Sequence, residues 1–312
     1  MIAERLVYGC ARLTGGASAA ASRRLIEACL AAGVRHFDSA PSYGMGTAER
    51  VLGSVLAGRP DVRVTAKVGS LRPRFATART WARAVKAVAR PRSTPLREEF
   101  TPLQANAHSA PLQLSREAIV RSVEISRNML QRQRLDALLL HEVQQADVGD
   151  TAIAVMETML AQGIAAEVGY STGTMAEPGS VDSLPKHWIA QTAVSPGMLV
   201  GPAPRHASDF LHTIVNTILF RQRSDEAFAG WLVGASELIP ETVADRRTAL
   251  IVAGYARLHT LMPDHGLIFA SIDPDRLAAF LAGVTHVDRN VGAERFGESL
   301  VPATASDGHL VS

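Results

Sequence analysis

The sequence predicts an α/β fold in which eight parallel strands alternate with helices and close into one barrel, the (β/α)8 or TIM barrel architecture. Short, nearly continuous apolar runs alternate along the chain with longer stretches of helical spacing. Strands that are apolar on both faces are typical of a parallel sheet covered by helices, and eight of them favour a closed barrel over an open sheet. Such barrels reach roughly 250 to 300 residues, so we expect a single domain over residues 1–312.

Four of the predicted strands lie in the first half of the chain, at residues 6–10, 34–40, 62–68 and 134–141. Helices are predicted at residues 22–33, 47–58 and 115–130. The first two are expected to begin at Ser22 and Thr47, because a hydroxyl at the N-cap accepts a hydrogen bond from the first turn. Both helices end at a glycine, Gly33 or Gly58.

The second half continues the same alternation. Its strands are predicted at residues 165–171, 187–195, 212–220 and 266–272. Its helices are predicted near residues 147–162, around 246–258, and from Pro274 to about Gly283. Proline suits the first turn of this last helix, since its missing N–H has no partner to lose there.

Two segments fall outside the repeat, a basic insert at about residues 70–114 and a C-terminal tail at about 285–312. The insert follows the third strand and is far longer than the two to six residues usual for such a loop. Between Lys67 and Glu98 it contains arginines and lysine but no acidic residue. It is either a solvated basic helix around TWARAVKAVAR or a segment at the barrel mouth that contacts an anion or cofactor.

The composition excludes several classes of protein. With 47% hydrophobic and 20% charged residues, the chain can bury a sizeable core, which excludes a disordered or low-complexity protein. The net charge is +2, so no strong positive field indicates a nucleic-acid partner. The two cysteines, Cys10 and Cys29, are too few for a disulfide framework and fit a reducing compartment.

The apolar runs are too short for a membrane span, since the longest end or meet a charge after about ten residues and a span needs about twenty. Glu4 and Arg5 also interrupt what would be the apolar stretch of an export signal. We therefore expect a cytoplasmic protein with no membrane partner.

Three polar residues lie at strand ends, where the barrel fold by itself calls only for apolar core residues or loop residues. They are Asp38, Lys67 and His141, at the ends of the second, third and fourth strands. The carboxyl ends of barrel strands meet at one mouth, where active sites lie. Tyr43, in the loop after Asp38, can reach the same mouth. Taken singly, each residue is better interpreted as a cap, a core residue or a packed ring; together they indicate a site.

These residues lie in segments that resemble the aldo-keto reductase family. The resemblance starts in GVRHFDSAPSYGMGTAERVLGSVL and continues through VTAKVG, SREAIVRSVEISRNMLQRQRLDALLLHE, QGIAAEVGYST and GLIFASIDPDRL. It covers most of the chain in order, with gaps in the basic insert and around residues 196–245. The resemblance implies an eight-stranded barrel that reduces an aldehyde or ketone with NADPH, or oxidises the corresponding alcohol or sugar.

The family's catalytic tetrad would fall on Asp38, Tyr43, Lys67 and His141. Hydride transfer leaves negative charge on the carbonyl oxygen, which a proton donor must neutralise. The resemblance assigns that role to Tyr43, which Lys67 would make more acidic, with Asp38 balancing the charge of Lys67. His141 would orient and polarise the carbonyl.

The resemblance also implies cofactor-binding residues and no metal. Ser171 and Gln191 would hold the nicotinamide amide, while Ser271 and Arg276 would bind the 2′-phosphate of the adenosine. The sequence departs from the family pattern at Thr172, Ala270 and Phe280, where Asn, Lys and Asn are usual. NADH is therefore retained as an alternative cofactor to NADPH.

Two other readings remain open from the sequence. The same barrel could serve as a catalytically weak nicotinamide-binding sensor or regulatory subunit. Alternatively, Lys67 could be the imine-forming amine of a phosphate-handling barrel, which would leave Asp38 and Tyr43 without a role.

Overall fold

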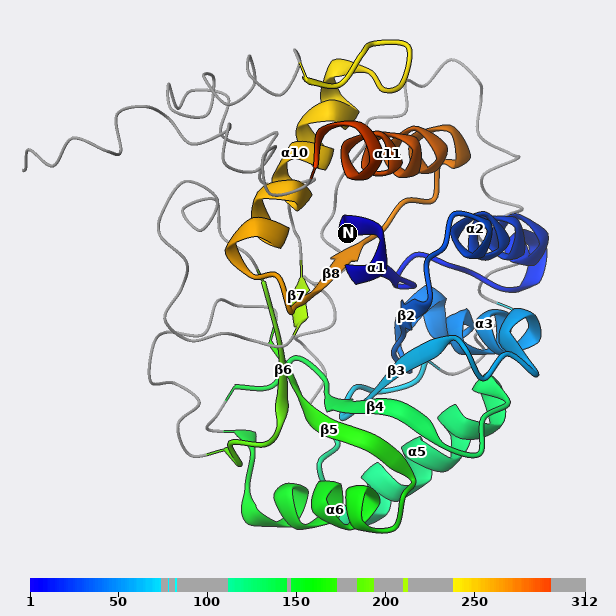
Figure 1. The fold of residues 1–312 in the computed structure, drawn as a ribbon. Helices are drawn as coiled ribbons and strands as arrows, with labels where there is room; N and C mark the ends of the chain where they lie inside the picture. Colours follow the sequence, from blue (N-terminus) through cyan, green and yellow to red (C-terminus); the bar gives the residue numbers. More distant parts are fainter. Residues whose placement is uncertain are drawn as a thin grey trace, which may run out of the picture. The chain divides into compact units, whose positions relative to one another are not determined.

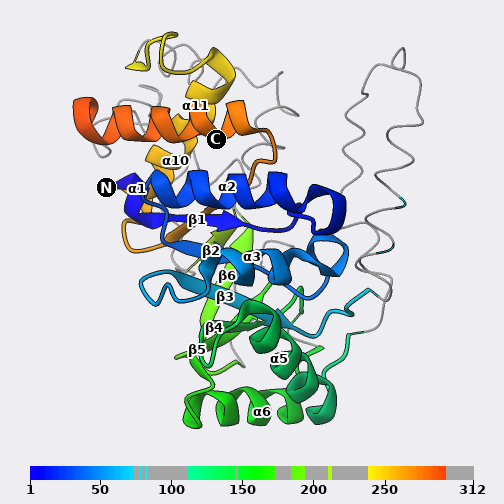
Figure 2. The ribbon, with the colours of Figure 1, turned by 90° about the vertical axis from the view of Figure 1, so that its right-hand side faces the viewer.

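The computed structural model describes residues 1–73, 112–144, 147–172, 184–193, 210–212 and 238–292, with the isolated positions 78 and 82. Its strands follow one another in chain order around a closed barrel, as predicted. Figure 1 labels all of them except β1, which is labelled in Figure 2. They are β1 (Leu6–Gly9), β2 (His36–Asp38), β3 (Arg63–Val68), β4 (Leu135–Leu140), β5 (Ala165–Ser171), β6 (Ile189–Ala193), β7 (Phe210–His212) and β8 (Gly266–Phe269).

Helices follow most of these strands. The α-helices are α1 (Ile2–Arg5), α2 (Ala19–Ala31), α3 (Ala48–Leu56), α5 (Arg116–Leu130), α6 (Asp150–Ala161), α10 (Arg246–Leu261) and α11 (Pro274–His286). Two 3₁₀ turns, η1 (Gly16–Ser18) and η2 (Tyr43–Gly46), precede α2 and α3, and a π-helical turn, η5 (Val287–Val291), follows α11. In the described part of the chain, no helix is long and apolar enough to cross a membrane.

Most predicted elements are confirmed, and three predictions need correction. Thr47 occupies the N-cap position of α3, but its hydroxyl donates to the Gly44 carbonyl and accepts from the Gly15 N–H, so it does not cap the helix. Helix α2 begins before Ser22, whose hydroxyl instead donates to the Thr14 carbonyl at 2.8 Å. Ser22 therefore ties the helix to the preceding loop and is not its N-cap. Strand β7 begins two residues before the predicted run 212–220. The rest of that run, most of the basic insert, and the tail beyond Gly292 lie outside the described residues.

The contacts of the chain divide it into two compact units. The larger one, residues 8–31 and 35–190, holds strands β2 to β5 with helices α2, α3, α5 and α6. Its strands pair in parallel, with Asp38 opposite Thr65 and Lys67 opposite Leu139. Helices α2, α3, α5 and α6 pack each against the next along the outside of these strands (Figure 2).

Helices α3 and α5 approach each other closely because α3 has a glycine at the crossing. A Cβ atom at Gly53 would lie only 2.1 Å from the Met129 carbonyl oxygen, so no larger residue fits there. The two cysteines of this unit, Cys10 and Cys29, are free and buried, and burial raises the pKa of the Cys29 thiol to about 12.

The second unit, residues 1–7, 32–34 and 191–312, has helices α10 and α11 packed against each other and against α1. Tyr255 on α10 donates to the Ile268 carbonyl at 2.7 Å, and its ring meets that of Phe280 at 5.1 Å. Phe280 is thus an aromatic core residue, buried also against Phe269. This packing explains why an apolar residue stands at position 280.

A buried ion pair anchors the start of the basic insert. The Glu49 side chain on α3 is fully buried and contacts the Arg72 guanidinium, which also approaches Ser126 and Met129 on α5. Arg72 lies four residues after β3 ends, so this contact fixes the chain just after it leaves the strand.

We expect Arg72→Leu to lower the free energy of unfolding by about 2 to 4 kcal/mol, because it leaves the Glu49 carboxylate buried without its cation. Urea denaturation measures the loss. Replacing both partners, with Arg72→Leu and Glu49→Leu, should recover most of it, since removing a whole buried pair is often close to neutral. Equal losses in the single and double variants would contradict this account.

Candidate active site

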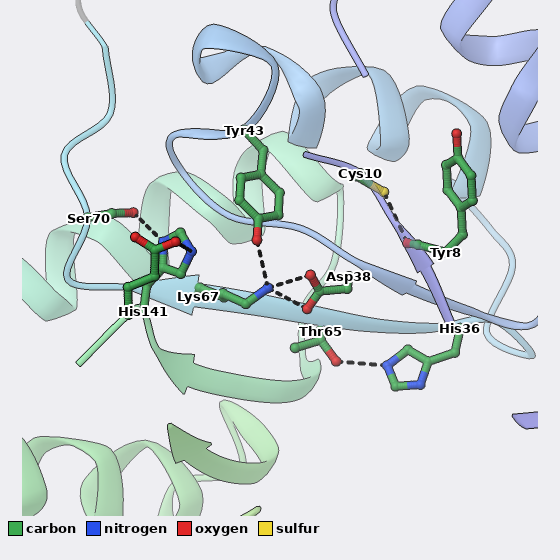
Figure 3. A network of polar contacts seen from close by, with 10 residues as sticks. Tyr8, Cys10, His36, Asp38, Tyr43, Thr65, Lys67, Ser70 and His141 are labelled. Atoms are coloured by element: carbon green, nitrogen blue, oxygen red, sulfur yellow. Dashed lines mark hydrogen bonds and ion pairs between the residues drawn. The ribbon is translucent and has the colours of Figure 1, made fainter. Parts of the chain in front are cut away.

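Four polar side chains converge at the carboxyl ends of the strands of the larger unit (Figure 3). Asp38 is the last residue of β2, Lys67 lies near the end of β3, and His141 directly follows β4. Tyr43 enters from the turn η2 with its hydroxyl directed at Lys67. The structure therefore brings together the four residues that the sequence predicted for one mouth.

Lys67 and Asp38 form a fully buried ion pair. The Lys67 ammonium donates to both oxygens of the Asp38 carboxylate, and neither side chain has more than 1% of its surface exposed. Burial lowers the pKa of Lys67, while the carboxylate of Asp38 opposes that change. The contact with Asp38 favours the charged form of Lys67, which has no lone pair to offer a carbonyl carbon, and this contact counts against Lys67 as an imine-forming amine.

Tyr43 reaches this ion pair because of the glycine that follows it. Gly44 has φ +56°, and a Cβ there would lie 1.7 Å from the Leu13 carbonyl oxygen. The Tyr43 hydroxyl lies 3.4 Å from the Lys67 Nζ, and this nitrogen lies 5.0 Å from the ring centroid. Burial raises the pKa of Tyr43 well above its usual value, and Asp38 and Glu142 add to the effect. The phenol is therefore protonated in this state.

His141 completes the group. Its Nδ1 lies 2.9 Å from the Ser70 hydroxyl, and its ring meets the Tyr43 ring edge-on, with centroids 5.4 Å apart. Its backbone N–H donates to the Val68 carbonyl, which holds the residue to the end of β3. The ring thus has a defined plane beside the Tyr43 hydroxyl.

A second polar pair lies on the same strands, each member two residues before a member of the ion pair. His36 on β2 and Thr65 on β3 bond side chain to side chain at 2.7 Å. Burial lowers the pKa of His36 from 6.5 to about 3, so its imidazole is neutral at pH 7. Sequence reasoning did not single out His36, although the two-residue period of a strand places it on the face of Asp38. It also did not single out Ser70 or Glu142, whose contacts with His141 no sequence pattern marks.

The predicted nicotinamide residues lie in different units. Ser171 ends β5 in the larger unit, is buried, and accepts a hydrogen bond through its carbonyl from the Val143 N–H. Thr172 next to it is also buried. Gln191 lies in β6 of the smaller unit, with its side chain 1% exposed. A buried amide and hydroxyls of this kind suit the recognition of a carboxamide.

Ser271 and Arg276 flank the start of α11. The Asp273 carboxylate caps that helix by accepting from the N–H groups of Asp275 and Arg276, and it lies 3.5 Å from the Arg276 Nε. Ser271 bonds the backbone of Asp273. The hydroxyl and the half-exposed guanidinium suit a phosphate, whereas the carboxylate suits a ribose 2′-hydroxyl. The donor set therefore fits the adenosine end of a nicotinamide dinucleotide with or without a 2′-phosphate.

Among the residues that the structure describes, no group of three or more His, Cys, Asp or Glu side chains is arranged to hold a metal ion.

Comparison with protein families matches residues 5–211 to the model of the aldo/keto reductase family. Pyridoxal 4-dehydrogenase from Microbacterium luteolum is 30% identical over 139 residues, which are 41% of this chain and 37% of that protein. The match thus spans little more than a third of this curated relative.

Solved structures share the fold at low sequence identity. An aldo-keto reductase from Bacillus halodurans in its holo form has a TM-score of 0.61 at 16% identity, with 96% of this chain and 92% of that chain covered. A glycerol dehydrogenase from Gluconobacter oxydans has a TM-score of 0.57 at 16% identity, with 92% of each chain covered. An aldo/keto reductase from Klebsiella pneumoniae, solved with NADP and acetate, has a TM-score of 0.57 at 16% identity, with 96% and 92% covered.

The buried imidazole of His36 predicts a measurable loss of stability in acid. Its pKa in the fold, about 3, lies below the 6.5 of the exposed ring, so its stabilising effect is complete above pH 6.5 and falls towards pH 3. The phenyl ring of a His36→Phe variant cannot take up a proton. The stability advantage of the natural chain over this variant should shrink by about 2 to 3 kcal/mol between pH 7 and pH 4.5. Urea denaturation at both pH values measures it, with His36→Phe/Thr65→Val as a companion that leaves no unpaired hydroxyl. An advantage independent of pH would contradict the prediction.

Proposed function

Since the chain belongs to the aldo/keto reductase family, we propose that it is an NADPH-dependent oxidoreductase that reduces a small aldehyde or ketone, or oxidises the corresponding alcohol or sugar. The observation that supports this most directly is the position of the Tyr43 hydroxyl, 3.4 Å from the ammonium of a buried Lys67–Asp38 pair and beside the His141 ring. The names of two relatives, pyridoxal 4-dehydrogenase and glycerol dehydrogenase, fit substrates of this size and the oxidative direction of the reaction.

Tyr43 is the proposed proton donor in reduction. When bound, the nicotinamide supplies the hydride, and the charge that develops on the carbonyl oxygen needs a proton. The raised pKa of Tyr43 keeps its hydroxyl protonated at neutral pH, which is the form that donates. An alkoxide is a stronger base than a phenolate, so proton transfer from Tyr43 remains favourable once hydride has arrived.

Lys67 and Asp38 stabilise the phenolate that remains on Tyr43 after proton transfer. A phenolate at Tyr43 would lie 3.4 Å from the Lys67 ammonium, whose charge stabilises it. The Asp38 carboxylate favours the charged form of Lys67 against the effect of burial and holds the ammonium in one place. Lys67 therefore needs no rearrangement when charge appears on Tyr43.

His141 is the second donor to the carbonyl oxygen. Its ring packs edge-on against Tyr43, so both side chains border the same position for the reacting carbonyl. Two donors directed at one oxygen fix the orientation of the substrate. They also stabilise the negative charge that develops on that oxygen.

Ser171 and Gln191 are proposed to hold the nicotinamide amide, and Ser271 and Arg276 the 2′-phosphate. Arg276 favours NADPH by a forked contact to phosphate. Asp273 acts in the opposite direction, because its carboxylate repels a phosphate and accepts a hydrogen bond from a 2′-hydroxyl. We therefore propose NADPH as the cofactor with NADH as a usable alternative.

Tyr43→Phe tests the proton donor. Turnover on a panel of aldehydes, ketones, alcohols and sugars should fall by about 10²- to 10⁴-fold, because the ring remains but the proton is lost. Nicotinamide absorbance follows the rate, and cofactor fluorescence should show unchanged binding. Tyr255→Phe, which removes a hydroxyl bonded to the Ile268 backbone, is the matched control and should keep its turnover. Full turnover in Tyr43→Phe would overturn the assignment.

Arg276→Ala and Asp273→Ser test the residues proposed to lie at the adenosine end of the cofactor. Loss of Arg276 should weaken NADPH binding by about 10- to 100-fold and leave NADH binding nearly unchanged, since only the phosphate loses a charged partner. Asp273→Ser keeps a capping hydroxyl and removes the negative charge, so it should strengthen NADPH binding selectively. Fluorescence titration with both cofactors measures these changes. Equal losses for NADPH and NADH in Arg276→Ala would contradict the phosphate role.

A further inference from the structure

Two side chains outside the predicted tetrad lie against the two ring nitrogens of His141. The Ser70 hydroxyl lies 2.9 Å from Nδ1, and the nearest Glu142 carboxylate oxygen lies 3.9 Å from Nε2. His141 itself is 2% exposed, so its ring has little water around it. The proton of a neutral imidazole occupies one nitrogen, and the groups beside the ring decide which.

We propose that Ser70 is a positioning residue that donates its hydroxyl to Nδ1 of His141 and, together with the Glu142 carboxylate beside Nε2, holds the ring with its proton on Nε2. This inference rests on the proposed carbonyl-polarising role of His141. It adds a residue whose only contact with the chemistry is through the imidazole.

The charge of Glu142 decides the direction of the Ser70 hydrogen bond. A hydroxyl can either donate to a ring nitrogen or accept from it, so the distance of 2.9 Å alone leaves both arrangements possible. A carboxylate near Nε2 favours a proton on that nitrogen, because the N–H dipole then points its positive end towards negative charge. With the proton on Nε2, Nδ1 has a lone pair, and Ser70 must donate.

The backbone places both groups in fixed positions. Ser70 follows Gly69, which has φ +98° and accepts a hydrogen bond from the Gln113 N–H at 2.8 Å. Two residues after Ser70, Arg72 binds the buried Glu49. The segment that carries Ser70 is thus fixed on both sides, and its hydroxyl need not be ordered when the substrate arrives.

Glu142 has a left-handed backbone, with φ +53°, which is uncommon for a residue other than glycine. Its neighbours are held in place, since the His141 N–H donates to the Val68 carbonyl and the Val143 N–H donates to the Ser171 carbonyl. A conformation that costs energy and persists between two such contacts is common at functional sites. Here the Glu142 carboxylate lies 3.9 Å from Nε2 of His141.

The tautomer matters because a carbonyl oxygen needs a hydrogen-bond donor. With the proton on Nε2, His141 can donate to the substrate oxygen while Nδ1 is satisfied by Ser70. With the proton on Nδ1, Nε2 would present a lone pair to that oxygen and repel it. Fixing the tautomer in advance removes this unproductive state from the resting enzyme.

The test is nitrogen NMR of the full-length chain, with the His141 signals assigned by their loss in His141→Gln. In the natural chain we expect the proton on Nε2. In Ser70→Ala we expect the Nδ1-protonated form to become detectable and kcat to fall by about 2- to 10-fold, as for the loss of one hydrogen bond. Ser70→Thr retains a hydroxyl and should restore both, and Ser54→Ala, a serine on the outside of α3, should change neither.

A natural chain with the proton on Nδ1, or a Ser70→Ala chain with unchanged tautomer, would overturn the proposal. A changed tautomer with unchanged kcat would overturn the positioning role. The NMR result does not depend on turnover. If the natural chain bound no nicotinamide cofactor and turned over no substrate, the proposed function would fail, and the spectra would still decide the assignment of Ser70.

Discussion

The ion pair between Lys67 and Asp38 is the interaction on which the rest of the site depends. An ammonium that is completely buried is costly unless an anion compensates for it, and here both carboxylate oxygens of Asp38 do so. Replacing the pair by apolar side chains of similar size would be near neutral or favourable for folding. Its presence at the strand ends therefore points to chemistry, where a fixed positive charge beside the Tyr43 hydroxyl is useful.

The barrel supplies this pair with a fixed geometry. Asp38 and Lys67 come from adjacent parallel strands, whose register is set by backbone hydrogen bonds rather than by the charges themselves. His36 and Thr65 bond to each other on the same strands and occupy the space behind the pair without adding charge, because His36 is neutral. An additional charge in that space would compete for Asp38 or repel Lys67. A neutral polar pair satisfies its own hydrogen bonds and leaves the ion pair undisturbed.

Strand periodicity and residue type made the barrel and the four converging residues predictable, because Asp, Lys and His rarely end apolar strands without a reason. Ser22 was mistaken for an N-cap because the same hydroxyl that caps a helix can also bond a loop that is distant in sequence, here at Thr14. Ser70 and Glu142 went unnoticed for a related reason. Their importance depends on where the backbone turns at Gly69 and at Glu142 itself, and a left-handed turn at a glutamate has no sequence signature. Phe280 stands where Asn is usual in the family, which suggests the loss of a polar contact. In the structure its ring packs against those of Tyr255 and Phe269.

The electrostatics around Tyr43 bear on the direction of catalysis. From the sequence, Lys67 was expected to make Tyr43 more acidic, yet burial and the carboxylates of Asp38 and Glu142 raise the pKa of the phenol. The Asp38 carboxylate offsets part of the positive charge that Lys67 presents to the hydroxyl in this state. The protonated phenol is the form that donates, but a raised pKa also makes it a weaker acid, so donation too depends on a positive charge that stabilises the phenolate. Oxidation of an alcohol would first require Tyr43 to lose its proton near two carboxylates, so that direction depends on Lys67 stabilising the resulting phenolate.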